Sequence, residues 1–168
     1  MATTAKGLND SENVQLATFV VGRFLFGIDV LRVQEVLRFQ KMTRVPLAPP
    51  VIVGLINLRG QIVPALDMRH RLGLEPRTSE ERPMNLVVRT EEAGVSLLVD
   101  DIGDVLELNS SSFETTPANV APNVREMIRG VYKLKNQLLL VLDTDKTVDI
   151  GLVVPLLKSA DQFLEIPQ

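Results

Sequence analysis

Two segments of the chain repeat each other without a gap. GLINLRGQIVPALD occupies residues 54–67 and GVYKLKNQLLLVLD occupies residues 130–143, at a constant offset of 76 residues. Upstream, VQEVL at residues 33–37 is similar to IGDVL at residues 102–106. Apolar hairpins resemble one another in general, but these copies also share a glycine, a glutamine and a closing aspartate. We therefore interpret the chain as the duplication of one unit.

The segments within each copy predict a mainly β fold. LATFVV and FLFGIDV are short, rich in Val, Ile and Phe, and separated by Gly22-Arg23, a pattern that favours a hairpin. MNLVVRT and GVSLLVD form a similar pair later in the chain. A single barrel of about 70 residues has a marginal core, and closure of a barrel removes exposed sheet edges. We therefore expect two small five-stranded barrels, packed into one folding unit with a groove between them.

Helices are expected in only a few places. Asp67 can cap a short helix, MRHRL, that Gly73 closes. Residues 75–83 are polar and flanked by prolines, which predicts an exposed loop. The apolar residues of VPLLKSADQFLEI recur at helical spacing, so we expect a C-terminal α-helix within residues 151–168.

Composition narrows the classes of function. The chain has 168 residues, 45% hydrophobic and 23% charged, which is typical of a globular protein. It contains no cysteine, so disulfides, thiol catalysis and cysteine-ligated zinc are not expected. The 18 basic and 21 acidic residues form no basic cluster, which argues against nucleic-acid binding. No apolar run approaches the roughly 20 residues that span a bilayer, and MATTAKGLND is not a secretory signal. We expect a cytoplasmic protein without direct membrane insertion.

No set of residues predicts an enzyme. His70, the only histidine, lies between arginines and is expected to be a solvated helix residue. No nucleophile elbow, phosphate-binding loop or dinucleotide fingerprint occurs. Asp100, Asp101 and Asp104 lack the glycine and later glutamate of a calcium loop. The sequence therefore predicts no catalysis, no metal and no cofactor, although a metal-dependent enzyme built on these three aspartates is the alternative from another class.

The turn Leu58-Arg59-Gly60-Gln61 carries an unexpected residue. Gly60 can supply the positive φ of a tight hairpin turn, but such turns usually carry Asn, Asp or Ser beside the glycine. Arg59 presents five donors in a rigid fork that suits a carboxylate or backbone carbonyls. Two interpretations stay open: Arg59 pairs with a nearby acid and pins the turn, or it contacts a partner. Lys135, at the matching position, lacks the planar fork.

The chain resembles the CheW family of bacterial chemotaxis coupling proteins. The resemblance rests on FGIDVLRVQEVL, on TRVPLAPPVIVGLINLRGQIVPALDMRHRLGL and on LLVDDIGDVLEL, and extends from about residue 16 to residue 150. It implies two SH3-like five-stranded barrels forming one CheW-like domain over residues 14–150, between a flexible N-terminus at residues 1–13 and the C-terminal helix and tail. It also implies a non-catalytic adaptor that links the cytoplasmic tip of methyl-accepting chemoreceptors to the regulatory domain of the histidine kinase CheA, recruited to membrane receptor arrays.

The resemblance also implies which residues bind partners. Arg59 and Gly60 belong to the N-L-R-G turn, whose arginine matches one important for receptor control of the kinase. Val33, Glu35 and Val36 belong to VQEV, the segment implicated in binding kinase and receptor. The apolar residues of this segment cannot all face one side of a strand, so we expect some apolar surface to stay exposed.

A second group is expected on the other copy. Val99 and Ile102 are the residues of that copy placed nearest the seam between the barrels. Because the receptor tip is a helical hairpin, we expect a helix to dock in the apolar groove there. An adaptor of another chemosensory pathway, controlling pili, gliding or development, would have the same sequence features.

Overall fold

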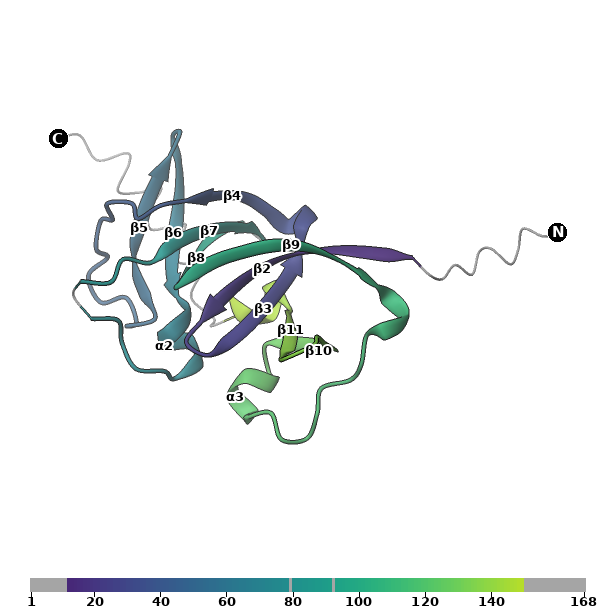
Figure 1. The fold of residues 1–168 in the computed structure, drawn as a ribbon. Helices are drawn as coiled ribbons and strands as arrows, with labels where there is room; N and C mark the ends of the chain where they lie inside the picture. The colour runs from purple at the N-terminus through teal and green to yellow at the C-terminus, as the bar shows by residue number, and fades with distance from the viewer. Residues whose placement is uncertain (1–11, 79, 92, 150–168) are drawn as a thin grey trace.

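The structure, a computed structural model, describes residues 12–149 except residues 79 and 92. Within this part the chain is mainly β, as predicted, and the helices are short (Figure 1). The C-terminal helix expected within residues 151–168 and most of the N-terminal stretch expected to be flexible lie outside the described residues. Among the described residues no helix is long and apolar enough to cross a membrane.

In the described part of the chain, ten strands form two five-stranded sheets. The first sheet has the order β10-β11-β3-β2-β9 and the second has the order β4-β7-β8-β6-β5. The strands of the first sheet are β2 (Asn13–Val21), β3 (Phe24–Asp29), β9 (Asp101–Asn109), β10 (Ile128–Lys133) and β11 (Leu138–Leu142). Those of the second are β4 (Val33–Leu37), β5 (Ile52–Leu58), β6 (Gln61–Asp67), β7 (Met84–Arg89) and β8 (Gly94–Val99). The helical segments are η1 (Val30–Arg32), α2 (Met68–Leu72), η2 (Ser110–Ser112), α3 (Pro122–Arg125) and α4 (Thr144–Thr147).

The two copies of the repeat are interleaved between the sheets. The first copy supplies β2 to β6 and the second supplies β7 to β11, and the two sheet orders match when each strand is replaced by its counterpart. Each copy gives its first hairpin to one sheet and its irregular strand and second hairpin to the other. Figure 1 accordingly shows β4 beside β7 and β9 beside β2. Neither barrel is formed by one contiguous copy.

The largest apolar core lies between the two sheets. Side chains of both sheets meet in this shared core, where Phe19 stacks on Phe26 with ring centroids 5.4 Å apart. Along β11, Leu140 and Leu142 face the shared core, whereas Leu139 and Val141 belong to a smaller cluster within the first sheet. A third cluster, around Ile56, Ala65 and Leu98, belongs to the second sheet. The seam between the sheets is therefore filled by the chain's own side chains.

The local predictions around the first repeated hairpin are confirmed. Asp67 accepts a hydrogen bond from the backbone N–H of Arg69 and so caps α2, and Gly73 ends the helix with φ of 73°. Gly22 takes a positive φ in the β2–β3 turn, as the hairpin prediction required. The equivalent aspartate of the second copy, Asp143, caps α4 in the same way.

The glycine that begins each repeated segment is required for the same physical reason in both copies. Gly54 and Gly130 both follow a register shift in their hairpins, where a loop segment passes over the strand. A Cβ placed on Gly54 would lie 2.8 Å from the backbone oxygen of Thr43, and one on Gly130 would lie 2.5 Å from that of Glu114. Thr43 and Glu114 each bridge to the residue after the glycine by two backbone hydrogen bonds. Only glycine lets these backbones approach so closely.

Substitution of either glycine should therefore destabilise the fold. We expect Gly54→Ala and Gly130→Ala each to lower the free energy of unfolding by about 1–3 kcal/mol, because the backbone oxygen that obstructs each Cβ cannot rotate away. Gly94→Ala is the matched control, since its nearest contact would be an ordinary 3.7 Å to Gln34 Oε1. Urea unfolding measures all three, and equal midpoints for the three variants would contradict this explanation.

Candidate functional site

Strand β4 carries an exposed apolar surface at the edge of the second sheet. It pairs with β7 only, and its register shifts between Val33 and Glu35. Val36 is 42% exposed and Phe39, just beyond the strand, is also 42% exposed. The expectation that this segment leaves apolar surface in solvent is confirmed, because alternate side chains of the strand point to opposite faces and Val36 lies on the exposed one.

The β5–β6 turn holds two consecutive residues in the left-handed region. Arg59 has φ of 52° and Gly60 has φ of 86°, the combination that a type I′ turn requires. The side-chain oxygen of Asn57 accepts the backbone N–H of Gly60 at 2.9 Å, which supports the turn. A long side chain at a left-handed position is uncommon and costs conformational energy. The turn must therefore be stabilised by other contacts.

Arg59 and Glu35 form a two-point ion pair. Nη1 of Arg59 donates to Oε1 of Glu35 and Nη2 donates to Oε2, both at 2.7 Å. The hydrogen bonds and charge of Arg59 hold the pKa of Glu35 below its ordinary value, against a smaller opposing effect of burial. Because Glu35 lies on β4 and Arg59 follows β5, the pair joins the two edge strands of the second sheet. The interpretation that Arg59 pairs with a nearby acid is confirmed.

This pair leaves much of Arg59 accessible. The Arg59 side chain is 76% exposed while that of Glu35 is 19% exposed. An exposed ion pair contributes little to stability, so its main effect here is to fix where the guanidinium lies. We call Val33, Glu35, Val36, Arg59 and Gly60 the β4–turn surface, because the ion pair brings these five predicted residues together.

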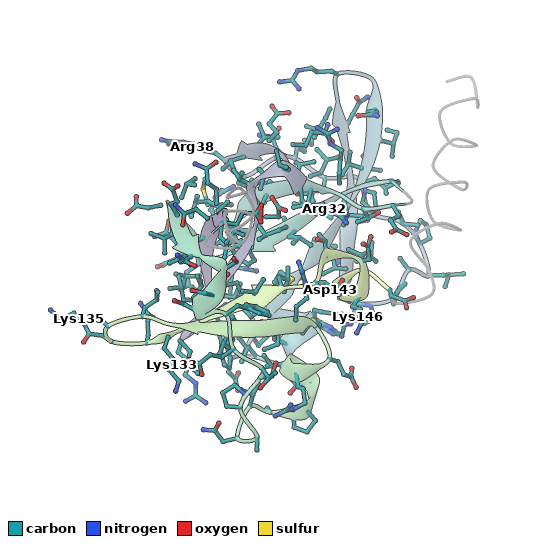
Figure 2. The ribbon with its side chains drawn as sticks, turned by 90° about the vertical axis from the view of Figure 1, so that its right-hand side faces the viewer. Arg32, Arg38, Lys133, Lys135, Asp143 and Lys146 are labelled. Atoms are coloured by element: carbon teal, nitrogen blue, oxygen red, sulfur yellow. The ribbon has the colours of Figure 1, made fainter. Side chains whose placement is uncertain are left out.

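The matching turn of the first sheet is arranged differently. Lys135 projects from the tip of the β10–β11 turn (Figure 2). Asp104 occupies the position of Glu35 in the second copy, and its backbone oxygen accepts the hydroxyl of Thr18. Within the described part of the chain, no ion pair joins Lys135 to Asp104. The first sheet therefore has no counterpart of the β4–turn surface ion pair.

The structure corrects one of the two site residues predicted on the second copy. Val99 is fully buried in the shared core, so its side chain is not available to a partner. The prediction failed because residues that end a strand beside the seam can point inward. Ile102 is half-buried at the margin of the shared core, as is Val33. A helix docked at this seam would lie on its margin, since the shared core fills the interior.

Asp100, one of the three aspartates that suggested a metal site, has other partners. Asp100 accepts Arg69 Nη2 at 2.8 Å, forms an ion pair with Arg77 at 3.0 Å, and accepts the backbone N–H of Gly22 at 2.6 Å. Burial would raise the pKa of Asp100, but the hydrogen bonds and these cations hold it below its ordinary value. The described residues contain no group of three or more side chains arranged to bind a metal ion. A carboxylate neutralised by two guanidinium groups is a poor metal ligand.

Several residues here were not found from the sequence. Arg77 comes from the segment predicted to be an exposed loop, yet it is 10% exposed and bridges Asp67 and Asp100. Arg82 lies 4.9 Å from the ring centroid of Phe39, beside the β4–turn surface. Leu47 is fully exposed with φ of 68°. The proline-flanked, charged composition of residues 75–83 gave no sign that one arginine would be buried.

The ion pair predicts a specific pH response. In the native chain Glu35 should titrate below its ordinary pKa, and Arg59→Ala should raise that pKa by removing the two hydrogen bonds. Because the folded-state pKa is lowered, the pair's contribution is present at neutral pH and is lost as the pH falls through the folded-state pKa. NMR titration of the Glu35 carboxyl carbon measures this directly. Lys135→Ala is the control, and an equal shift in that variant would contradict the assignment.

The comparisons with known proteins agree on one family. The profile described as CheW-like domain matches residues 15–150. A chemotaxis protein CheW from Klebsiella aerogenes is 29% identical over 146 residues, covering 87% of this chain and 88% of that protein. One from Bacillus subtilis is 30% identical over 135 residues, covering 80% and 86%.

A solved structure has the same architecture. The scaffolding protein TtCheW from Thermoanaerobacter tengcongensis superposes with a TM-score of 0.75 at 25% identity, covering 83% of this chain and 95% of that one. The expected mainly β fold with two five-stranded sheets is thereby confirmed. With its duplicated strands, filled seam and matching profile, the chain belongs to the family of CheW-like domains.

Proposed function

We propose that the protein is a non-catalytic adaptor that couples chemoreceptors to the histidine kinase CheA in cytoplasmic signalling arrays at the membrane. Membership of the CheW-like domain family and the names of the relatives support this proposal. The scaffolding role stated for TtCheW is of the same kind. The expected partners are the regulatory domain of CheA and the helical tip of the receptors.

The ion pair of Glu35 and Arg59 is the observation that carries the proposal. Glu35 takes up two of the five donors of Arg59, and the rest of the exposed guanidinium can reach backbone or carboxylate oxygens of a partner. At the next position of β4, on the opposite face of the strand from Glu35, Val36 is 42% exposed and offers apolar surface. Exposed apolar surface next to an oriented charged group suits a modest, reversible protein interface.

The pair also gives the turn a defined mechanical role. Arg59 sits at a left-handed position at the tip of a hairpin, while Glu35 belongs to the opposite edge of the same sheet. A partner that draws Arg59 away would free Glu35 and loosen the contact between the two edges. Receptor binding could thereby alter the strand edge that CheA contacts, without any chemistry in the adaptor.

Substitution at the turn tests receptor control. Arg59→Ala should leave the fold intact, since the pair is exposed, but should uncouple kinase activity from receptor input. Reconstituted arrays of receptor, CheA and adaptor measure kinase activity with and without attractant. Lys135→Ala, at the equivalent turn of the first sheet, is the matched control and should leave control intact. Normal attractant response in the Arg59→Ala array would refute this role.

Substitution on β4 tests the kinase contact. Glu35→Lys should weaken binding to the CheA regulatory domain by at least about tenfold, or ~1.4 kcal/mol. Titration calorimetry with the isolated regulatory domain measures the affinity, and Asp104→Lys at the equivalent position of β9 is the control. If both variants bind as the native chain does, the kinase contact lies elsewhere. A pull-down with the native chain then identifies the kinase and receptor, which also distinguishes chemotaxis from pathways for pili, gliding or development.

A further inference from the structure

A duplicated chain of this kind has two ways to arrange its strands. In the observed, interleaved order, β6 lies parallel to β8 and β11 lies parallel to β3. In a contiguous order, each copy would form its own sheet, with β6 beside β3 and β11 beside β8. Each sheet would keep the same sequence of corresponding strands in either order. Charged contacts that differ between the two orders would therefore add to their discrimination.

The first such interaction lies where β6 and β8 end together. Asp100 follows β8 directly, and Arg69 lies on α2, which follows β6. Nε and Nη2 of Arg69 donate to the Asp100 carboxylate at 2.8–3.2 Å, and both side chains are 19% exposed. The same carboxylate accepts the N–H of Gly22 in the β2–β3 turn of the other sheet. We call this arrangement the first clamp.

A second clamp lies where β3 and β11 end together. Arg32 follows β3 in η1, and Asp145 lies on α4, which follows β11. Their side chains are paired at 3.4 Å, and each is 37% exposed. Asp145 also accepts the N–H of Glu91 in the β7–β8 turn, as Asp100 accepts that of Gly22. In Figure 2, Arg32 lies above Asp143 and Lys146, the labelled residues on either side of Asp145 in sequence.

Each clamp pairs one arginine with one aspartate, but the acid and the base exchange places between the two clamps. Arg69 and Asp145 occupy the same position of the repeat, at the offset of 76 residues that relates Asp67 to Asp143. In the first clamp the acid follows the first hairpin and the base lies on the helix, whereas in the second clamp these places are exchanged. At the upstream offset of 69 residues, Arg32 matches Asp101, the residue after Asp100. In the contiguous order, Arg32 would therefore lie near Arg69, and Asp100 would lie near Asp145. Both sites would then hold like charges.

We propose that this inverted pair of clamps selects the interleaved strand order over the contiguous one. Like charges brought together are unfavourable, and more so at the first clamp, whose side chains are 19% exposed, than at the second, whose side chains are 37% exposed. Both contacts therefore disfavour the contiguous order. The clamps lie at the two crossovers, where the chain passes from one sheet to the other. They can therefore influence which sheet each following strand joins. Arg77 reinforces the first clamp, because it pairs with both Asp67 and Asp100.

Cysteine pairs can report which order forms, because the native chain has no cysteine. Gln15 of β2 faces Glu107 of β9, so Gln15→Cys with Glu107→Cys reports the interleaved order. The repeat offset that matches residues 33–37 to residues 102–106 makes Arg38 the counterpart of Glu107. Gln15→Cys with Arg38→Cys therefore reports the contiguous order. Arg38 is exposed and projects from the surface (Figure 2), so both reporters replace exposed residues.

Exchange of charges within the second clamp is the deciding experiment. Arg32→Asp with Asp145→Arg keeps opposite charges at both clamps in the interleaved order, so the fold is retained. It also places opposite charges at both clamps in the contiguous order and so removes the discrimination. Each variant is reduced, unfolded in urea, refolded and oxidised. The yield of the intramolecular disulfide between positions 15 and 38 should be at least about tenfold higher than in the same cysteine variant with native clamps. Non-reducing electrophoresis quantifies it.

A second variant drives the choice further. Arg69→Asp with Asp145→Arg puts like charges into both clamps in the interleaved order and opposite charges into both in the contiguous order. The disulfide between positions 15 and 38 should then be the main product. Arg32→Ala with Asp145→Ala, which removes one clamp without inversion, should fall between this variant and the native chain. If, after the exchange within the second clamp, the cysteine pair at positions 15 and 107 still forms its disulfide and the pair at positions 15 and 38 does not, the clamps do not select the order. That result stands even if the second variant fails to fold.

Discussion

Phe19, Phe26 and Leu66 lie in one apolar cluster that both sheets line, and a five-stranded sheet of this size cannot bury such side chains alone. The smaller clusters within each sheet hold only a few residues each. Most of the hydrophobic stabilisation therefore comes from contact between the sheets, and the two halves must fold as one unit. This constraint requires both sheets to fold together, but it does not by itself specify which copy supplies each strand.

Filling the seam moves the available binding surface to the edges of the sheets. The surface proposed for docking is the β4–turn surface, where the Glu35–Arg59 pair ties one edge of the second sheet to the other. The pair adds little to the stability of the fold, and its main effect is to hold the Arg59 guanidinium in one position. A left-handed arginine is tolerated there because the acid across the gap and the Asn57 side chain both hold the turn.

The two copies have kept their scaffold and diverged at their polar contacts. Glycines at 54 and 130 and aspartates at 67 and 143 do the same work in both sheets, since backbone approach and helix capping are needed twice. Charged residues differ instead: Arg59 is matched by Lys135, and Arg69 by Asp145. Such differences give one pseudo-symmetric fold two distinct surfaces, which the proposed binding of two unlike partners requires.

The sequence by itself determined the duplication, the mainly β fold, the capped helix after Asp67 and the tight turn at Gly60, because each depends on local patterns of glycine, aspartate and alternating apolar residues. The family resemblance assigned Glu35 and Arg59 to partner binding. Their ion pair with each other was seen only in the structure. Tertiary structure alone decided that Val99 faces inward, that the Arg77 side chain is only 10% exposed between Asp67 and Asp100, and that the copies interleave. Those outcomes depend on which of two similar partners each strand meets, and residues far apart in the chain settle that choice through charge and packing.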